Sequence, residues 1–192
     1  MKYYLRKNKA SYIVYSPYVW FILLLKGISF NTKCYFNGFP YFHKAKKSKL
    51  ILGIQCRFNS RTTSNLIGIN HRCIISTLSE GAVLKIGDGC GFSGTTIGCF
   101  VHVELGKNVR CGANTLITDS DWHQDDPRAG NPKPVIIEDN VWLGYGVIVL
   151  KGVTIGKNSV IGAGSVVTRS IPSNVIAAGN PCRIVKNLII EK

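Results

Sequence analysis

Between residues 137 and 171 an aliphatic residue recurs at every sixth position, and a second small or β-branched residue follows each one four positions later. The repeated aliphatic residues are Ile137, Leu143, Val149, Ile155, Ile161 and Val167. An amphipathic helix would space its apolar residues by three and four, and a half-buried strand would alternate by two. A spacing of six predicts a solenoid with triangular coils, in which each hexad forms one side and its aliphatic residue faces the axis.

The same spacing extends, less regularly, back to Leu50, and it sharpens from Ile86 onward. Three hexads complete one coil, so equivalent residues stack about every 18 positions and pair as parallel strands. We therefore predict one solenoid domain over residues 50–192, with roughly six coils, short bulges in its first half and a C-terminal tail at residues 177–192. Residues 119–134 have no periodicity and carry four acids, three prolines and one histidine. We expect them to form a loop that stands off the prism.

Charge is distributed unevenly along the chain. Residues 1–79 contain 13 of the 24 Lys and Arg residues and no Asp or Glu, whereas all 10 acidic residues lie further along. A basic segment of this kind is typical of proteins that contact an anionic partner such as a membrane surface, a phosphorylated lipid-linked sugar or nucleic acid. It would also aid solubility and attract a polyphosphate cofactor, so the charge alone leaves the partner open.

Residues 1–49 form a separate basic and aromatic segment, which we expect to be largely helical. Its apolar core, residues 19–25, is too short to span a bilayer, and Pro17 interrupts the run before it. Two interpretations remain open: an interfacial helix that contacts a membrane, and a helix that caps the open end of the solenoid. Residues 35–49 combine aromatic and basic side chains but show no RNA- or DNA-binding motif, so we expect no nucleic-acid partner.

The hexads, together with the sequence IAAGNPCRIV at residues 176–185, resemble those of the hexapeptide-repeat acyltransferases. The resemblance implies an all-β fold, the left-handed parallel β-helix, whose hand the spacing itself does not determine. It also implies an acetyl-CoA-dependent O-acetyltransferase of the sugar or surface-polysaccharide branch, assembled as a homotrimer with each active site between neighbouring subunits. Such an enzyme would act on a sugar of a capsule, exopolysaccharide or glycolipid, in the cytoplasm or at the inner face of the membrane.

His123, in the interrupting segment, is the candidate catalytic base because imidazole is basic enough to remove a proton near neutral pH. Asp119 or Asp121 would hold its second ring nitrogen. The resemblance sharpens this hypothesis, since the family places its catalytic histidine in a loop just before the regular hexads. It implies that His123 removes a proton from an acceptor hydroxyl, which attacks the thioester directly. A backbone amide near Gly144 is a candidate oxyanion donor.

The resemblance also implies a binding site for the acetyl-CoA co-substrate. Its residues would be Trp142, Gly144, Ala163, Thr168, Arg169 and Arg183. Glycine at a coil corner lets an extended pantetheine arm approach the backbone, and arginine pairs with phosphate groups. Candidate acceptor-binding residues are His71, Ser93 and Thr95. The family's acceptor strand often carries an asparagine that is missing from the matching stretch at residues 92–97, so the acceptor stays open.

The residues also bear on three other functions. The same base would serve transfer to the nitrogen of an amino sugar nucleotide or to serine. The gamma-class carbonic anhydrases share the fold but need three converging histidines, and His71, His102 and His123 lack the close pair that such a site requires, so we expect no metal. A non-enzymatic scaffold would need neither the histidine loop nor the basic C-terminal corners. Seven scattered cysteines without a CxxC pair indicate packed thiols rather than disulfides.

Overall fold

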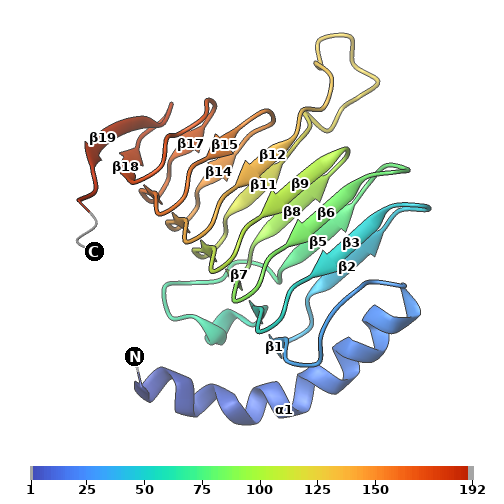
Figure 1. Cartoon of the computed structure of the whole chain (residues 1–192). Helices are drawn as coiled ribbons and strands as arrows, with labels where there is room; N and C mark the ends of the chain where they lie inside the picture. The colour runs from blue at the N-terminus through green and yellow to red at the C-terminus, as the bar shows by residue number, and fades with distance from the viewer. Residues whose placement is uncertain (1, 190–192) are drawn as a thin grey trace.

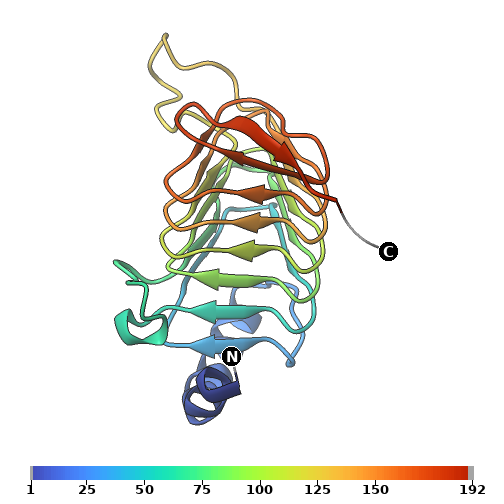
Figure 2. The same ribbon diagram turned by 90° about the vertical axis from the view of Figure 1, so that its left-hand side faces the viewer.

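The computed structural model describes the backbone of residues 2–189 and the side chains of residues 12–189. One helix, α1 (Lys2–Leu25), lies across the end of a triangular prism of short parallel strands (Figure 1). Apart from the last strand, the strands pair in parallel with strands of neighbouring coils and stack into three sheets along the prism axis (Figure 2).

Successive strands enter the three sheets in turn. Sheet 1 contains β1 (Tyr35–Asn37), β4 (Arg57–Asn59), β7 (Gly91–Ser93), β10 (Arg110–Cys111), β13 (Trp142–Leu143), β16 (Val160–Ile161), β18 (Val175–Ala178) and the antiparallel β19 (Arg183–Asn187). Sheet 2 contains β2 (Tyr41–Lys44), β5 (Ile74–Thr77), β8 (Thr96–Cys99), β11 (Leu116–Thr118), β14 (Ile148–Val149) and β17 (Val166–Val167). Sheet 3 contains β3 (Lys49–Leu52), β6 (Val83–Ile86), β9 (His102–Leu105), β12 (Val135–Ile137) and β15 (Thr154–Ile155).

The aliphatic residues of the hexads fill the interior of the prism. All six repeated residues from Ile137 to Val167 have no exposed surface, and the residues four positions after them are also buried. At one corner, four asparagines adopt the left-handed conformation that a tight turn needs: Asn108, Asn140, Asn158 and Asn174. Their amide side chains are hydrogen-bonded from coil to coil at 2.8 to 3.3 Å. The period of six therefore encodes both the core and the turns.

The solenoid begins earlier than the sequence predicted. Its first coil contains β1 and β2, so residues 35–49 belong to the prism rather than to a separate segment. Aromatic rings occupy the interior there, and Phe36, Phe58 and Phe92 stack with centroids 5.1 and 4.9 Å apart. Because aromatic residues replace the aliphatic ones, this coil does not show the hexad pattern that marks the C-terminal half.

Two loops project from the prism. Residues 119–134 connect β11 to β12 and form the long loop at the top of Figures 1 and 2. Residues 60–73 connect β4 to β5 and include a single 3-10 turn, η1 (Thr62–Ser64). The sequence predicted only short bulges in this region, because the polar residues of the second loop resemble those of an irregular coil.

Helix α1 covers the open end of the first coil. Val19 and Leu23 are buried against the interior residues of that coil. The Phe36 amide donates to the Ser16 hydroxyl at 3.1 Å, and the Trp20 indole donates to the Cys34 carbonyl at 3.3 Å. An open coil would expose unpaired backbone groups and apolar side chains to water, and the helix satisfies part of that need.

Candidate active site

The base of the 119–134 loop is held by a pair of opposite charges. The Asp121 carboxylate accepts from the Lys151 ammonium at 2.5 Å and from the Gly130 amide at 3.1 Å. Lys151 also donates to the Gly130 carbonyl at 2.9 Å, so it contacts both arms of the loop. Lys151 follows β14, one coil further along sheet 2, which ties the loop to the regular part of the solenoid.

Trp122 fixes the position of the next residue, His123. Its ring packs over Gly98, where any side chain would clash with it, and makes an edge contact with Phe100 at a centroid distance of 5.4 Å. Its indole N–H donates to the Thr118 hydroxyl at 3.0 Å. The backbone φ of Trp122 is 70°, a left-handed conformation that is rare for a bulky residue and costs of order 1 to 3 kcal/mol. The ring contacts compensate for this strain.

His123 presents its imidazole to solvent on this anchored turn. Its backbone amide donates to the Asp121 carbonyl at 2.9 Å, and its carbonyl accepts from the Asp126 amide at 3.1 Å. Within residues 12–189 the ring itself makes no hydrogen bond or ion pair. The backbone is therefore ordered by its own turn while both ring nitrogens remain available to a substrate.

The two acids expected to orient His123 have other partners. Asp119 is fully buried, and its carboxylate accepts from the backbone amides of Phe100, Val101 and His102 at 2.7 to 2.8 Å. These three consecutive amides form the turn into β9, which the buried charge stabilises. Asp121 is bound to Lys151 and Gly130. In this structure neither carboxylate contacts His123, because each is needed to hold the backbone around the loop.

The candidate acceptor residues lie around the second loop. His71 is exposed, with Nδ1 2.9 Å from the Arg72 carbonyl. The Ser93 hydroxyl accepts from the side-chain amides of Asn59 and Asn65 at 3.3 and 3.2 Å. Thr95 is completely buried and faces the interior, so its hydroxyl is not accessible to an acceptor at the surface of this chain.

Of the candidate coenzyme residues, Gly144 and Ala163 lie at the corner between sheets 1 and 2, and Trp142 lies on β13 of sheet 1 before that corner. Trp142 is exposed on β13 and lines a cavity of about 500 Å³ with Arg110. A Cβ atom at Gly144 would lie 2.6 Å from the Ala163 backbone nitrogen, so glycine permits the close stacking of these coils. The Gly144 amide donates to the Ile161 carbonyl at 2.8 Å and so is not free to serve as an oxyanion donor.

Thr168 and Arg169 lie at a different corner, whereas Arg183 pairs with Ala178 at the corner between sheets 1 and 2. Thr168 and Arg169 are exposed directly after β17, at the same corner of the prism where the His123 loop follows β11. Arg183 is exposed on β19, and its guanidinium donates to the Cys182 carbonyl at 2.9 Å. The chain thus divides the predicted coenzyme residues between two corners, which the width of sheet 2 separates.

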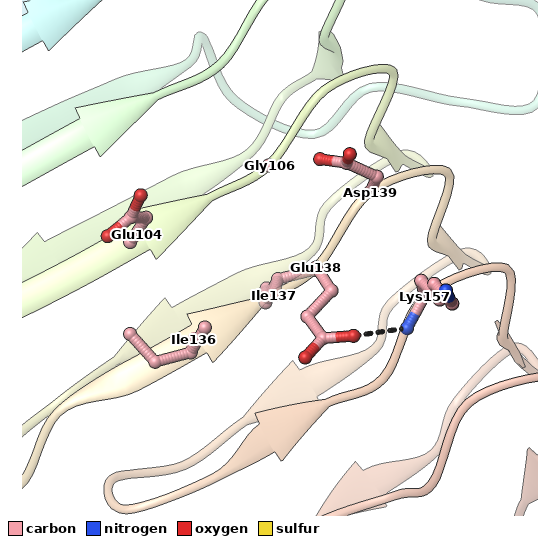
Figure 3. A pocket seen from close by; sticks show the side chains of 7 residues that line it. All are labelled: Glu104, Gly106, Ile136, Ile137, Glu138, Asp139 and Lys157. Carbon is pink, nitrogen blue, oxygen red and sulfur yellow. Dashed lines mark hydrogen bonds between the residues drawn. The ribbon is translucent and has the colours of Figure 1, made fainter.

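A further cavity of about 270 Å³ lies on sheet 3 and contains none of the predicted site residues. Figure 3 shows Glu104, Glu138 and Asp139 around it, and the Glu138 carboxylate accepts from the Lys157 backbone amide at 2.8 Å. Three carboxylates would repel the phosphates of a nucleotide. This face is therefore a poor candidate for the coenzyme.

Comparison with known proteins identifies the repeat. Residues 134–169 match the family described as the hexapeptide repeat of succinyl-transferase. The chain carries the hexapeptide repeat. The solved structure of a variant of AntD, an N-acyltransferase from Bacillus cereus, superposes on this hexapeptide-repeat chain with a TM-score of 0.67 at 19% identity, covering 88% of each chain. This likeness shows the fold, and the predicted left-handed parallel β-helix is confirmed.

Two curated relatives are similar in sequence to part of the hexapeptide-repeat chain. A galactoside O-acetyltransferase of Lactococcus lactis is 51% identical over 87 residues, which cover 45% of this chain and 41% of the relative. A galactoside O-acetyltransferase of Escherichia coli is 44% identical over 90 residues, covering 45% of this chain and 44% of the relative. The match thus spans less than half the length of each of these two curated relatives.

The clamp between Asp121 and Lys151 gives a prediction on pH. The Lys151 ammonium, followed by the Gly130 amide, holds the pKa of Asp121 below its ordinary value of 3.8. A lowered carboxyl pKa stabilises the folded loop above the ordinary value, and this contribution is lost as the pH falls through the lowered one. We expect hydrogen exchange of the 119–134 loop, corrected for intrinsic rates, to stay constant from neutral pH down to about pH 5 and to rise only below about pH 4.

Lys151→Met should remove the clamp and raise exchange in the loop at neutral pH, and its difference from the wild type should shrink below about pH 4. Lys133→Met is the matched control, because Lys133 is exposed at the other end of the same loop and should leave exchange unchanged. Equal protection in wild type and Lys151→Met would show that the ion pair does not hold the loop.

Proposed function

We propose that this protein transfers the acetyl group of acetyl-CoA to a hydroxyl group of a sugar. The observation that carries the proposal is the unpaired imidazole of His123, displayed on a clamped loop of a hexapeptide-repeat solenoid. The similarity to two galactoside O-acetyltransferases supports both the acetyl group and the sugar. Residues that position a base while leaving its ring free suit direct transfer between two bound substrates.

In the proposed mechanism His123 acts as the general base. Its unprotonated ring nitrogen takes the proton of the acceptor hydroxyl as the oxygen attacks the thioester carbonyl. The tetrahedral intermediate then collapses, the carbon–sulfur bond breaks, and the imidazolium returns its proton to the leaving thiolate. The products are the acetylated sugar and free coenzyme A, so no acyl-enzyme forms. A hydrogen bond that holds the second ring nitrogen would come from the bound acceptor or a neighbouring subunit.

The proposed donor site uses both corners of the prism. Trp142, Gly144 and Ala163 would line the path of the pantetheine arm, with Thr168 beside it. Arg169 and Arg183 would pair with the nucleotide phosphates, since guanidinium groups bind phosphate through charge-assisted hydrogen bonds. Both arginines are exposed, and no carboxylate of the described chain pairs with either one. Cations without a carboxylate partner are the best evidence for this part of the site.

The active unit in this proposal is a homotrimer. One chain holds the His123 loop and the Gly144 and Ala163 corner at different edges of sheet 2, so a site that uses both is completed by a neighbouring subunit. The outward side chains of sheet 2 are largely aliphatic and half-buried, as an interface requires: Ile74, Leu116, Ile148 and Val166. Light scattering at micromolar concentration should give three times the monomer mass, and a monomer there would contradict the proposal.

The acceptor is proposed to belong to a capsule, exopolysaccharide or glycolipid that is assembled at the cytoplasmic face of a membrane. The support for this placement is the basic and aromatic character of residues 1–49, which would bring the protein to an anionic lipid surface.

Calorimetric titration of acetyl-CoA into the wild type and into Arg183→Ala tests the donor site. We expect Arg183→Ala to weaken binding about 10- to 100-fold, because each charge-assisted hydrogen bond contributes roughly 1.5 to 3 kcal/mol. Arg57→Ala changes another exposed arginine, near the far end of sheet 1, and should bind acetyl-CoA normally. No binding to the wild type at about millimolar acetyl-CoA, in the presence and absence of candidate sugars, would refute the transferase proposal.

A further inference from the structure

Helix α1 has a second apolar face, which points away from the solenoid. Ser16, Val19 and Leu23 pack against the first coil. The opposite face exposes five large apolar side chains, each 58 to 75% accessible: Ile13, Val14, Phe21, Leu24 and Leu25. In Figures 1 and 2 the helix forms one end of the molecule, and the rest of the chain lies on the side of its packed face.

The two faces follow from helical geometry. Residues three and four positions apart share a face, which groups Ser16, Val19 and Leu23 toward the prism. Phe21 and Leu24 are three apart and fall on the other side with their neighbours. The solenoid needs only one apolar face of its capping helix. A capping helix whose outer side faced only water would not need a second apolar face. An exposed apolar patch of this kind therefore marks a site of interaction.

Aromatic and basic side chains border this outer face. Tyr18 and Phe39, both exposed, meet edge to face at a centroid distance of 5.3 Å. Arg61 lies over the ring of Tyr15, 5.7 Å from its centroid, and Lys26 and Lys33 are exposed between the helix and β1. Aromatic rings and cations beside an aliphatic surface are typical of helices that lie at the headgroup level of a bilayer.

We propose that the outer face of α1 binds the surface of an anionic membrane, with the helix parallel to the bilayer plane and its aliphatic side chains among the headgroups and upper acyl chains. The charge of residues 1–79, with 13 cations and no acid, complements such a surface. A second copy of the chain is a poorer partner, because two strongly basic ends would repel each other. Nucleic acid is also a poorer partner, because it would not bury the apolar side chains of Val14, Leu24 and Leu25. None of the helices described is long and apolar enough to cross a membrane.

The biological role of this membrane binding rests on the proposed function, because a transferase bound to a membrane would have direct access to lipid-linked sugars. Its test does not depend on catalysis. The full chain is centrifuged with vesicles of phosphatidylcholine alone, or with about a third phosphatidylglycerol. We expect binding to the anionic vesicles at least about tenfold tighter than to the neutral ones, and an approximately tenfold loss of affinity from 0.05 to about 0.5 M salt.

The double variant Phe21→Asp and Leu24→Asp should weaken binding to anionic vesicles by about 100-fold, since burying each large apolar side chain contributes a factor of about ten. The matched control is Ile67→Asp, on the 60–73 loop, because its 61% exposure falls between the 58% of Phe21 and the 66% of Leu24. It should bind within about twofold of the wild type. Unchanged thermal unfolding of all variants would confirm that the fold survives.

Insertion of the helix can be read directly. All seven cysteines are buried, so a polarity-sensitive dye will label an introduced surface cysteine selectively. Dye on Leu24→Cys should shift to shorter wavelength on anionic vesicles, whereas dye on Ile67→Cys should not.

Four outcomes would overturn the proposal. The wild type could bind neither kind of vesicle, or could bind both kinds equally. The Ile67→Asp control could lose as much vesicle affinity as the double variant. The dye on Leu24→Cys could shift with protein concentration in the absence of lipid. The last would assign the face to a second copy. Acetyl-CoA calorimetry on the double variant distinguishes a failure of membrane binding from a failure of the proposed function. The double variant should bind acetyl-CoA normally even though it no longer binds vesicles.

Discussion

Replacement of His123 by alanine is expected to lower the rate of acetyl transfer by a factor of about 10² to 10⁴ while leaving acetyl-CoA binding within about twofold of the wild type. The imidazole is the group available to take the hydroxyl proton, whereas the predicted donor residues lie on the coil corners. The loss should appear in kcat more than in KM. Steady-state kinetics with a galactoside acceptor, together with calorimetry of the donor, would measure both.

His102→Ala is the control for this experiment, since His102 is half-buried on β9 with Nε2 3.4 Å from Glu104. It should keep nearly full activity. If His123→Ala transferred acetyl groups at the wild-type rate, the base would have to be another residue, and the proposed mechanism would be wrong even if the donor bound normally.

Asp119→Ala should give the largest loss of stability of any substitution near the loop, about 3 to 5 kcal/mol in the free energy of unfolding. The fully buried carboxylate accepts from three backbone amides, and alanine would leave all three without this partner. Urea denaturation followed by far-ultraviolet circular dichroism would measure this change, provided that the m-value stays constant.

Two comparisons identify the cause of that loss. Asp119→Asn keeps one oxygen but turns the other into a donor facing backbone amides, so we expect an intermediate cost. Asp125→Ala, in the exposed part of the same loop, should cost less than about 0.5 kcal/mol. A small effect for Asp119→Ala would mean that water enters and satisfies the three amides.

The hexad pattern predicted the C-terminal half of the fold residue by residue, because every repeated position from Ile137 to Val167 is buried. The first coil could not be found in the same way. Its interior is filled by Phe36 and Phe42, which keep the spacing of six but are aromatic rather than aliphatic, and the 60–73 loop then interrupts the repeat. Periodicity is informative only while one kind of side chain fills the core.

The candidate site was predictable as a loop but not as a set of contacts. Asp119 stands among polar residues in the sequence, yet it is buried because the amides of residues 100–102 come from the preceding coil. Lys151 is one of many lysines in the sequence. It pairs with Asp121, 30 residues earlier, only because the coils that carry the two residues stack on each other. Such partners come from different coils, so no local pattern marks them.

The stacking of coils also determines the distance between the first coil and the His123 loop. Strand β11, from which the His123 loop leaves, is the fourth strand of sheet 2 counted from β2, and β2 belongs to the coil that α1 covers. Three strand spacings of about 4.8 Å place the base of the loop about 14 Å from that first coil. Gain or loss of one coil between them would move the loop by a single fixed increment and leave both ends intact. The solenoid therefore acts as a spacer whose height depends on the number of coils. A change in coil number could match the catalytic loop to acceptors that extend to different distances from a surface.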